Sequence, residues 1–272
     1  MNIAILMACH NRKKLTLDCL KNLFNAELPP NYNLSVYLVD DGSTDGTSEA
    51  ILGAYPRVNV ISGNGNLYWN RGMQKAWSVA QKESYDFYLW LNDDTQLYEN
   101  ALKVILNDSV QMDNLAIICG TTLSSHELHD VSYGGYTKSN VKIIPNGMLQ
   151  KCWWFNGNFV LVPRFVFQNV GGLDILFHHF LGDVDYGLRA QKKGIQCFVA
   201  SEVIGICAGH SNLPNWKNNS LNIFKRLYHL YSPLGCNPFE FYKFRSRHNG
   251  TLSGILQFIN LHLKVIFPRF LK

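Results

Sequence analysis

The sequence predicts an α/β fold in which helices cover both faces of a mostly parallel sheet. Short apolar runs alternate with helix-like stretches through the first two-fifths of the chain, and such alternation implies crossover connections between parallel strands. Polar clusters follow two of these runs directly, which is where ligands sit in parallel sheets. The chain has 272 residues and is 47% hydrophobic, which suits one large folded unit or a domain plus an extension.

The individual elements follow from local patterns in the first hundred residues. We expect strands at 3–8, 34–39, 58–61 and 87–91, because each is a short apolar run. Helices are expected at 12–24, 48–54 and 71–82. The first of these helices places Leu15, Cys19 and Leu23 on one face.

The alternation becomes looser after residue 100. Strands are expected at 116–120, 159–162 and 204–207, and a helix at 183–193 that ends before Gly194, a typical glycine beyond a helix C-terminus. The stretch 125–151 contains glycine pairs and a Pro-Asn-Gly turn, which favour hairpins or a mobile loop.

The chain divides at about residue 211. Residues 1–211 are expected to form the α/β domain, in two parts that meet near residue 100. Residues 212–272 are expected to form a basic amphipathic helical extension, with breaks at Pro233, Pro238, Gly250 and Pro268. Residues 211–272 contain nine Lys or Arg and one acid, so they carry +8 and the first 210 residues carry −3 of the net +5. This asymmetry indicates an anionic partner, such as lipid headgroups, a lipid-linked diphosphate or nucleic acid; a helical cap packed on the domain is the alternative.

The remaining bulk features point to the cytosol. The N-terminal charges follow the apolar run, the reverse of a secretory signal, and no apolar run reaches the ~18 residues that a membrane span needs. Seven cysteines are scattered without a CxxC pair, which is typical of reduced core thiols.

Two adjacent carboxylates, Asp93 and Asp94, end the apolar run 87–91 after a single asparagine. Neighbouring carboxylates repel each other unless a hard cation such as Mg²⁺ or Mn²⁺ bridges them to phosphate oxygens. A plain strand-to-loop turn is the alternative. Asp40 and Asp41 repeat the pattern after run 34–39, where an Asx-rich turn is the simpler explanation.

A third acidic set lies at the start of helix 183–193. Asp185 precedes Arg189 by four residues, and this helical ion pair is a sufficient structural explanation for it. Asp183 has no such partner. It is either an N-cap or a general base that faces a cleft.

Six segments together resemble family two of the glycosyltransferases, which have the GT-A fold. They are, in the family's order and spacing, ILMACHNRKKLTLDCLKNL, VYLVDDGSTDGT, NGNLYWNRGMQKAW, YLWLNDDTQLY, NGNFVLVPRFVFQNVGGLD and GDVDYGLRA. The resemblance runs from about Ile3 to His210, and VDDGSTDGT together with LNDDT makes it specific. More loosely, the chain looks like the branch that builds rhamnose-containing or related surface polysaccharides.

The resemblance implies a role for each matching donor-side residue. Asp41 would accept a hydrogen bond from the donor's pyrimidine ring, and Asp40 would support the turn or the ribose. Asp93 and Asp94 stand at the family's metal motif, with Asp94 the direct ligand. Asn64 and Asn70 are expected to face the donor. His210 is expected to be a third metal ligand, although a lone histidine at such a position is more often structural.

The resemblance also implies the base and the acceptor contacts. Asp183 aligns with the catalytic aspartate, although the family often has Glu-Asp where this chain has Gly182-Asp183. Asp185 is the reserve candidate for the base and is also expected to contact the acceptor. Trp153 and Trp154 lie where acceptor contacts are expected, followed by Asn156 and Gly157, and aromatic faces stack on sugar C–H surfaces. Two adjacent tryptophans are as often part of a core.

The implied function is an inverting glycosyltransferase of the hexosyltransferase class that uses Mn²⁺ or Mg²⁺. Residues 1–100 would bind a UDP- or dTDP-sugar and residues 100–211 a glycan or lipid-linked glycan acceptor, with no nucleic acid involved. The protein would be cytoplasmic and peripheral on the inner face of the membrane. Two alternatives have different chemistry. A sugar-phosphate nucleotidyltransferase would need a glycine-rich basic loop where this chain has ACHNRKK, and a carbohydrate-binding module would not need three acidic clusters.

Overall fold

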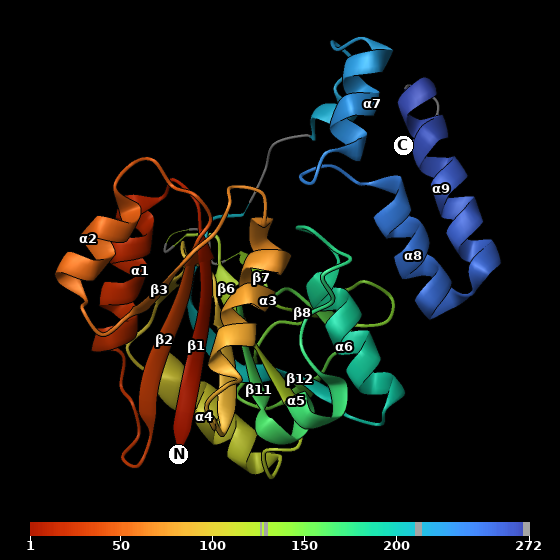
Figure 1. Ribbon diagram of the computed structural model, residues 1–272. Helices are drawn as coiled ribbons and strands as arrows, with labels where there is room; N and C mark the ends of the chain where they lie inside the picture. Colours follow the sequence, from red (N-terminus) through yellow and green to blue (C-terminus); the bar gives the residue numbers. More distant parts are fainter. Residues whose placement is uncertain (126, 128–129, 210–213, 269–272) are drawn as a thin grey trace.

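A computed structural model describes the chain except for residues 126, 128–129, 210–213 and 269–272. Among the described residues its centre is a ten-stranded sheet with the main order β3-β2-β1-β4-β11-β6-β12-β5, in which β7 pairs with β6 and β9 with β12 (Figure 1). The strands are β1 (Asn2–Cys9), β2 (Asn33–Asp40), β3 (Asn59–Ser62), β4 (Phe87–Leu91), β5 (Gln96–Leu97), β6 (Ile117–Leu123), β7 (Val131–Tyr133), β9 (Gln150–Lys151), β11 (Phe159–Pro163) and β12 (Cys197–Ile206). A separate small sheet pairs β8 (Gly135–Tyr136) with β10 (Trp154–Phe155).

The predicted parallel crossover units are confirmed for β1 to β4. Strand β1 lies between β2 and β4, and β2 pairs with β3, all in parallel. The second half of the sheet is mixed, because β11 runs antiparallel between β4 and β6, whereas β12 is parallel to β6. This arrangement leaves the carboxyl ends of β1, β2 and β4 together at one edge.

Helices cover both faces of the sheet and complete two hydrophobic layers. Side chains of β1 alternate between the layers, with Ile3 and Ile5 in one and Ala4 and Leu6 in the other, as a strand buried on both faces requires. The first layer contains α1 (Lys13–Asn25), α2 (Thr47–Ala54) and α4 (Ala101–Gln111). The second contains α3 (Tyr68–Ala80), α5 (Arg164–Val170) and α6 (Gly182–Lys192).

Three details differ from the sequence-based expectation. Leu15 is 44% exposed, because the buried stripe of α1 is formed by Thr16, Cys19, Leu20 and Leu23. Helix α3 begins at Tyr68, three residues before its expected start, and helices α4 and α5 were not predicted.

The seven cysteines are free, and all except Cys236 are buried, in agreement with core thiols.

The C-terminal part is helical, as expected, and each predicted break lies at or near a helix boundary: Pro238 begins a helix, and Pro233, Gly250 and Pro268 follow helix ends. It consists of the short η1 (Asn215–Lys217) and three α-helices, α7 (Ile223–Tyr231), α8 (Pro238–Asn249) and α9 (Thr251–Ile266). We call residues 214–268 the extension. It has a small core of its own, formed by Trp216, Leu230, Leu261 and Val265. No helix in the described ranges is long and apolar enough to cross a membrane.

Helix α8 connects the extension to the body of the protein, and α7 and α9 lie farther from the body (Figure 1). Arg247 donates hydrogen bonds to Asp185 on α6 at 2.8 Å and to Asp174 at 2.6 Å. Glu240 accepts from the His178 ring at 2.6 Å. The extension is therefore held by ion pairs with the second half of the domain.

Candidate active site

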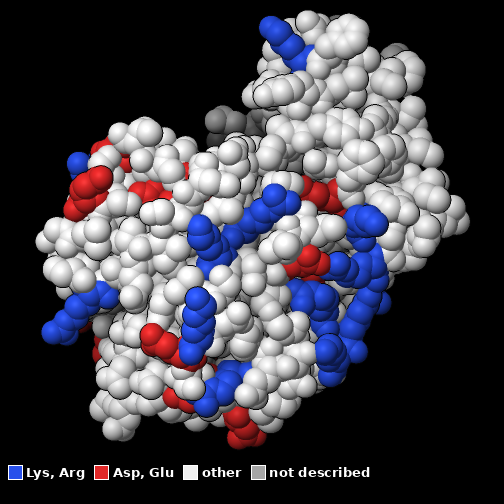
Figure 2. All heavy atoms as spheres, in the orientation of Figure 1, with Lys and Arg blue, Asp and Glu red and all other residues white. Residues whose placement is uncertain are grey.

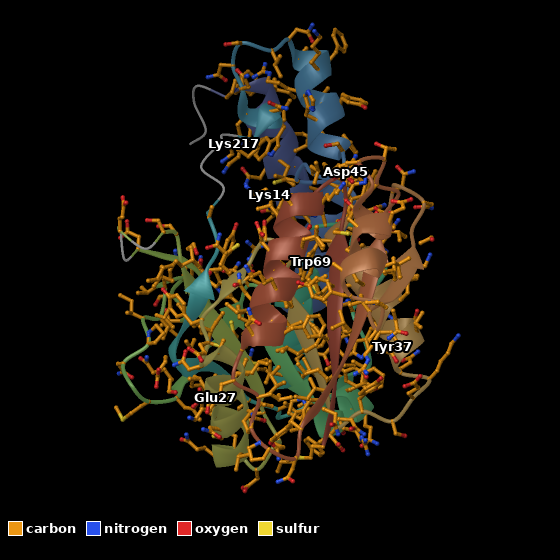
Figure 3. All side chains as sticks on the ribbon, turned by 90° about the vertical axis from the view of Figure 1, so that its left-hand side faces the viewer. Lys14, Glu27, Tyr37, Asp45, Trp69 and Lys217 are labelled. Atoms are coloured by element: carbon orange, nitrogen blue, oxygen red, sulfur yellow. The ribbon has the colours of Figure 1, made fainter. Side chains whose placement is uncertain are left out.

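The predicted acidic clusters meet at the carboxyl ends of β1, β2 and β4. The parallel register places Cys9, the last residue of β1, beside Asp40, and Asp93 is the second residue after the end of β4. Figure 3 shows Lys14 and Asp45 at the end of the body that faces the extension, with Glu27 toward the opposite end. This edge is where ligands bind in open α/β sheets.

Asp40 supports the turn that follows β2. Its carboxylate accepts a hydrogen bond from the backbone N–H of Ser43 at 2.9 Å and another from the Ser48 hydroxyl on α2. Asp40 is 5% exposed. Of the two roles implied for it, turn support and ribose contact, the contacts made here belong to the first.

Asp41 fixes the glycine-rich loop between β3 and α3. One carboxylate oxygen accepts from the N–H of Gly65 at 2.8 Å, and the other accepts from Leu67 and Tyr68 at 2.8 and 3.0 Å. A side chain at Gly63 would meet the Asp41 Cα at 2.6 Å, so this close approach requires glycine. Contact between Asp41 and a donor base stays a prediction. A base could bind to a lone pair of the Asp41 carboxylate that these three hydrogen bonds do not use, or after a shift of the loop.

Arg12 bridges the two carboxylates that follow β4. Its Nη1 lies 3.1 Å from Asp93 Oδ1 and 2.8 Å from Asp94 Oδ2. Burial of Asp93 raises its pKa to about 7; the charge of Asp94 acts in the same direction, and Arg12 opposes it. The second oxygen of Asp94 accepts from the Cys207 thiol at 3.4 Å. The pair therefore lies in surroundings where extra positive charge is favourable.

The acidic pair has the donor set for a hard divalent cation. Asp93 Oδ2 is buried and has no hydrogen-bond partner, although a buried carboxylate oxygen normally has one. No group of three or more His, Cys, Asp or Glu in the described part of the chain could form a complete cage. Mg²⁺ and Mn²⁺ commonly take one or two carboxylates plus substrate phosphates, so two protein ligands are sufficient when a diphosphate supplies the others.

Asp183 lies in the first turn of α6 and points toward β10 and β11. Its carboxylate accepts from the N–H of Gly157 at 2.9 Å and from Val184 at 2.8 Å. Burial of the carboxyl raises its pKa to about 6, against these two hydrogen bonds, which lower it. Helix α6 begins after Leu181, whose φ of 71° is a left-handed conformation that is strained for leucine. Asp183 is therefore a positioned carboxylate that ionises close to neutral pH, not an N-cap.

Trp69 joins the acidic pair to Asp183. Its indole N–H donates to Asn92, the residue before Asp93, at 2.7 Å. A Cβ built on Gly157 would lie 2.4 Å from the Trp69 ring and 3.3 Å from the Asp183 Cβ, so the indole, the glycine and the base are packed together. Any larger residue at position 157 would separate them.

The expected acceptor side contains a rigid aromatic pair. Trp154 stacks on Tyr136 at 3.7 Å between ring centroids, and its indole N–H donates to Asn140 at 2.9 Å. One face of Trp154 is therefore covered. Asn156 accepts from the N–H of Gly134 at 3.3 Å, and Trp153 is 40% exposed.

Two expected contact residues are buried in structural roles instead. Asn70 is fully buried, and its amide donates to the carbonyls of Asp174 and Phe177 at 2.8 and 2.7 Å, so it does not face a donor. A side chain at Gly182 would overlap the Asn70 carboxamide, which explains why this chain has glycine there and no glutamate. Asp185 is also fully buried, so it is not available to an acceptor. Its carboxylate accepts from Arg189 at 2.7 Å, the predicted helical pair, and from Arg247 and His248 at 2.8 Å each.

The two other predicted residues have different outcomes. Asn64 is exposed and accepts from the N–H of Asn66 at 3.0 Å in the glycine loop. His210 lies outside the described residues. Sequence reasoning missed Arg12, which follows the predicted strand 3–8, and Trp69, which lies between the predicted strand 58–61 and the predicted helix 71–82.

Comparison with protein families gives a direct match. Residues 4–171, more than half of the chain, match the model of glycosyl transferase family 2. Among characterised proteins, the chain is similar to the N-acetylglucosaminyl-diphospho-decaprenol L-rhamnosyltransferase of Mycobacterium tuberculosis, with 23% identity over 191 residues. This match covers 59% of the chain and spans about three-fifths (62%) of the length of that relative.

Solved structures of glycosyltransferases have the same fold. The mannosyltransferase PcManGT from Pyrobaculum calidifontis, in complex with GDP-Man and Mn²⁺, aligns over 98% of this chain and 87% of its own with a TM-score of 0.61 and 12% identity. A structure of S. aureus TarS in complex with UDP-GlcNAc aligns over 100% of this chain and 93% of its own, with a TM-score of 0.60 and 11% identity. The predicted GT-A fold is thereby confirmed.

Proposed function

Because the chain belongs to glycosyl transferase family 2, we propose that it transfers one sugar from a nucleoside-diphosphate sugar to an acceptor hydroxyl of a growing surface glycan, with inversion at the anomeric carbon. One observation carries this proposal: Asp183, with a pKa of about 6, and the pair Asp93–Asp94 are joined through Trp69 into a single site. A nucleotidyltransferase or a binding module would have no use for a base placed in this way.

Asp183 is the general base in this proposal. Its carboxylate takes the proton of the acceptor hydroxyl while that oxygen forms a bond to the anomeric carbon. The bond between this carbon and the diphosphate breaks, and its electron pair leaves with the nucleoside diphosphate. Attack from the side opposite the leaving group inverts the anomeric centre.

The donor side uses the residues at the ends of β2 and β4. Asp93 and Asp94 would hold Mn²⁺ or Mg²⁺, which when bound neutralises charge on the departing diphosphate. Asp41 and the loop it fixes, together with Asn64, would contact the nucleoside, and Asp40 would hold the turn that positions Asp41. Asp93 Oδ2, which has no partner, supports the metal assignment. The metal in the mannosyltransferase complex supports it for the fold.

A UDP- or dTDP-sugar is the proposed donor, and a lipid-linked glycan is the proposed acceptor. The name of the mycobacterial relative specifies a lipid-linked sugar diphosphate as acceptor, which supports this choice. Gly157 lies beside Asp183 between β10 and β11, and it would contact the acceptor sugar together with Asn156 and Trp154 from the same segment.

The direct test is a donor screen with the purified full chain. UDP- and dTDP-sugars are supplied with a lipid-linked N-acetylglucosamine diphosphate and Mn²⁺, and products are weighed by mass spectrometry. We expect one product heavier by one sugar, with inverted anomeric configuration by NMR. Retained configuration would contradict the mechanism, and transfer of a nucleotidyl group would contradict the reaction class.

The extension is proposed to hold the protein at the inner face of the membrane. The outer face of α9 is apolar along its whole length: Leu252, Ile255, Leu256, Ile259, Leu263 and Ile266 are between 39% and 69% exposed. Phe224 and Tyr228 on α7 are 79% and 74% exposed. Figure 2 shows the upper part of this lobe almost without charged side chains on the face drawn. Such a surface is larger than single exposed apolar residues explain.

Charge favours a lipid surface over a second protein copy as the partner. In the extension the exposed charged side chains are basic, namely Lys217, Lys225, Lys243 and Arg245, whereas its one acid, Glu240, is buried against His178. Two copies would bring these like charges together, whereas anionic headgroups attract them, by about 1 kcal/mol for each basic residue close to the surface. Arg247 does not take part, because it is bound to Asp174 and Asp185.

Liposome co-sedimentation tests the membrane contact. The native protein should bind vesicles that contain phosphatidylglycerol and be released as salt rises. Leu252→Gln with Leu256→Gln should reduce binding by more than about tenfold, because about 0.8 kcal/mol is lost for each CH₂ no longer buried. The matched control is Leu52→Gln with Val110→Gln, which removes two side chains of similar exposure from α2 and α4. Equal effects of both pairs, or dimerisation without vesicle binding, would contradict the proposal.

A further inference from the structure

Arg12 occupies the place between the acidic pair where a cation is needed. It lies at the N-terminus of α1, directly beyond β1, and its guanidinium contacts both Asp93 and Asp94 through a single nitrogen, Nη1. A guanidinium that bound one carboxylate as a stable structural pair would usually use two nitrogens in parallel. The observed contact is that of one positive centre shared by two anions.

Arg12 leaves part of the acidic pair without a positively charged partner. Asp93 is 5% exposed, and its Oδ2 atom, the oxygen that Arg12 does not touch, has no hydrogen-bond partner. Leaving such an atom unpaired is unfavourable for folding, and a cation bound at this oxygen would satisfy it. Arg12 itself is 38% exposed and borders a shallow hollow of about 580 Å³, so its side chain has space to move away.

The geometry points to Arg12 as an internal competitor for the divalent metal: the guanidinium neutralises Asp93 and Asp94 when no metal is bound, and a metal ion displaces it. This inference rests on the metal part of the proposed function. Metal alone then binds weakly, because it must break both contacts of Arg12. When metal arrives with a nucleoside diphosphate, the displaced guanidinium has the diphosphate oxygens as new anionic partners. Arg12 thus couples metal binding to donor binding.

Metal titration of variants tests this coupling without any transfer assay. Binding of Mn²⁺ alone is followed by electron paramagnetic resonance for the native protein, Arg12→Gln and Lys14→Gln. Lys14→Gln is the matched control, because it removes the same charge two residues along from an exposed side chain (Figure 3). We expect Arg12→Gln to bind Mn²⁺ about tenfold more tightly, which corresponds to about 1.4 kcal/mol, whereas Lys14→Gln should differ from the native protein by less than about twofold.

Two further measurements decide the interpretation. UDP and dTDP should each increase the Mn²⁺ affinity of the native protein by a larger factor than that of Arg12→Gln, because only the native protein has a guanidinium to transfer. Mn²⁺ should also raise the melting temperature of Arg12→Gln more than that of the native protein, since tighter binding to the folded state stabilises it more.

The opposite results would overturn the inference. Weaker Mn²⁺ binding by Arg12→Gln would show that Arg12 holds the carboxylates in place for the metal, and equal binding would show that it does not compete. No Mn²⁺ binding by either protein would make Arg12 the permanent cation of the site and also overturn it. The donor screen tests sugar transfer independently of these titrations. A negative titration would therefore overturn the role of Arg12 and leave the proposed reaction to be judged by the donor screen.

Discussion

Replacement of Asp185 by asparagine should loosen the extension from the body. Asp185 is fully buried, and its two oxygens accept from three side chains: Arg189 on the same helix, and Arg247 and His248 on α8. Asparagine keeps one acceptor oxygen, removes the negative charge and turns an NH₂ group toward cationic donors. Arg247 retains Asp174, whereas the buried His248 ring loses its partner.

The magnitude follows from burial. An exposed helical pair of the Asp185–Arg189 type would contribute only ~0.3–0.5 kcal/mol. Removal of one member of a buried ion pair typically costs about 3–5 kcal/mol. We expect about 3 kcal/mol for Asp185→Asn, because asparagine retains one acceptor and Arg247 retains a partner, and this corresponds to a fall in Tm of roughly 6–12 °C for a chain of this size.

Thermal unfolding and hydrogen exchange of α8 measure the effect. The matched control is Glu27→Gln, which breaks an exposed pair with Lys103 and should change stability by less than about 0.5 kcal/mol. Burial raises the pKa of Asp185, but the hydrogen bonds from His248, Arg189 and Arg247 lower it more, so that in the folded state this pKa lies below its usual value. Its contribution is therefore present above the unfolded pKa of about 4 and is lost as the pH falls through the folded pKa, so the difference between native protein and variant should shrink in acid. A loss no larger than the control's at pH 7 would refute this reasoning.

Three further predictions concern the active site. Asp94→Ala should abolish transfer and weaken Mn²⁺-dependent binding of UDP or dTDP, because the cation loses an anionic ligand; full activity of that variant, or of the native protein in EDTA, would exclude the metal assignment. The rate of transfer should fall as the pH drops through about 6, because protonated Asp183 cannot accept a proton. Because the pKa of Asp183 is raised on folding, ionisation of its carboxyl opposes folding above the unfolded pKa of about 4. Asp183→Asn should therefore melt no lower than the native protein at pH 7. A markedly lower Tm would argue against the raised pKa.

The architecture of the domain was predictable because its strands are short, apolar and separated by strong turn signals. The extension was predictable for the same reason, since α7 ends shortly before Pro233, α8 begins at Pro238 and ends before Gly250, and α9 ends shortly before Pro268. The antiparallel insertion of β11 between β4 and β6 was not predictable, because strand order depends on contacts between segments about 70 residues apart in sequence. Helix α5 was missed because it begins directly after Pro163, which ends the strand and also pre-sets the start of a helix.

The roles of individual site residues were harder to predict than their location. Asp183 and Asp185 are two residues apart on one helix and have the same chemistry, yet one faces Gly157 and the other is buried beneath α8. The local pair with Arg189 indicated a structural role for Asp185, but its contacts with Arg247 and His248 depend on the docking of the extension, which no local pattern reports. Asn70 and Arg12 are similar cases: the first is turned inward by the carbonyls of Asp174 and Phe177, and the second lies between carboxylates 81 and 82 residues away.

The central claim is that this chain transfers a sugar with Asp183 as the base. The most direct measurement is turnover by Asp183→Asn in the donor screen, with Mn²⁺-dependent binding of the donor measured on the same samples. We predict that donor binding is unchanged and that the yield of the product heavier by one sugar falls by roughly 10²-fold or more, because the amide is nearly isosteric with the carboxylate but cannot take a proton. Turnover within a few-fold of the native protein would contradict the claim.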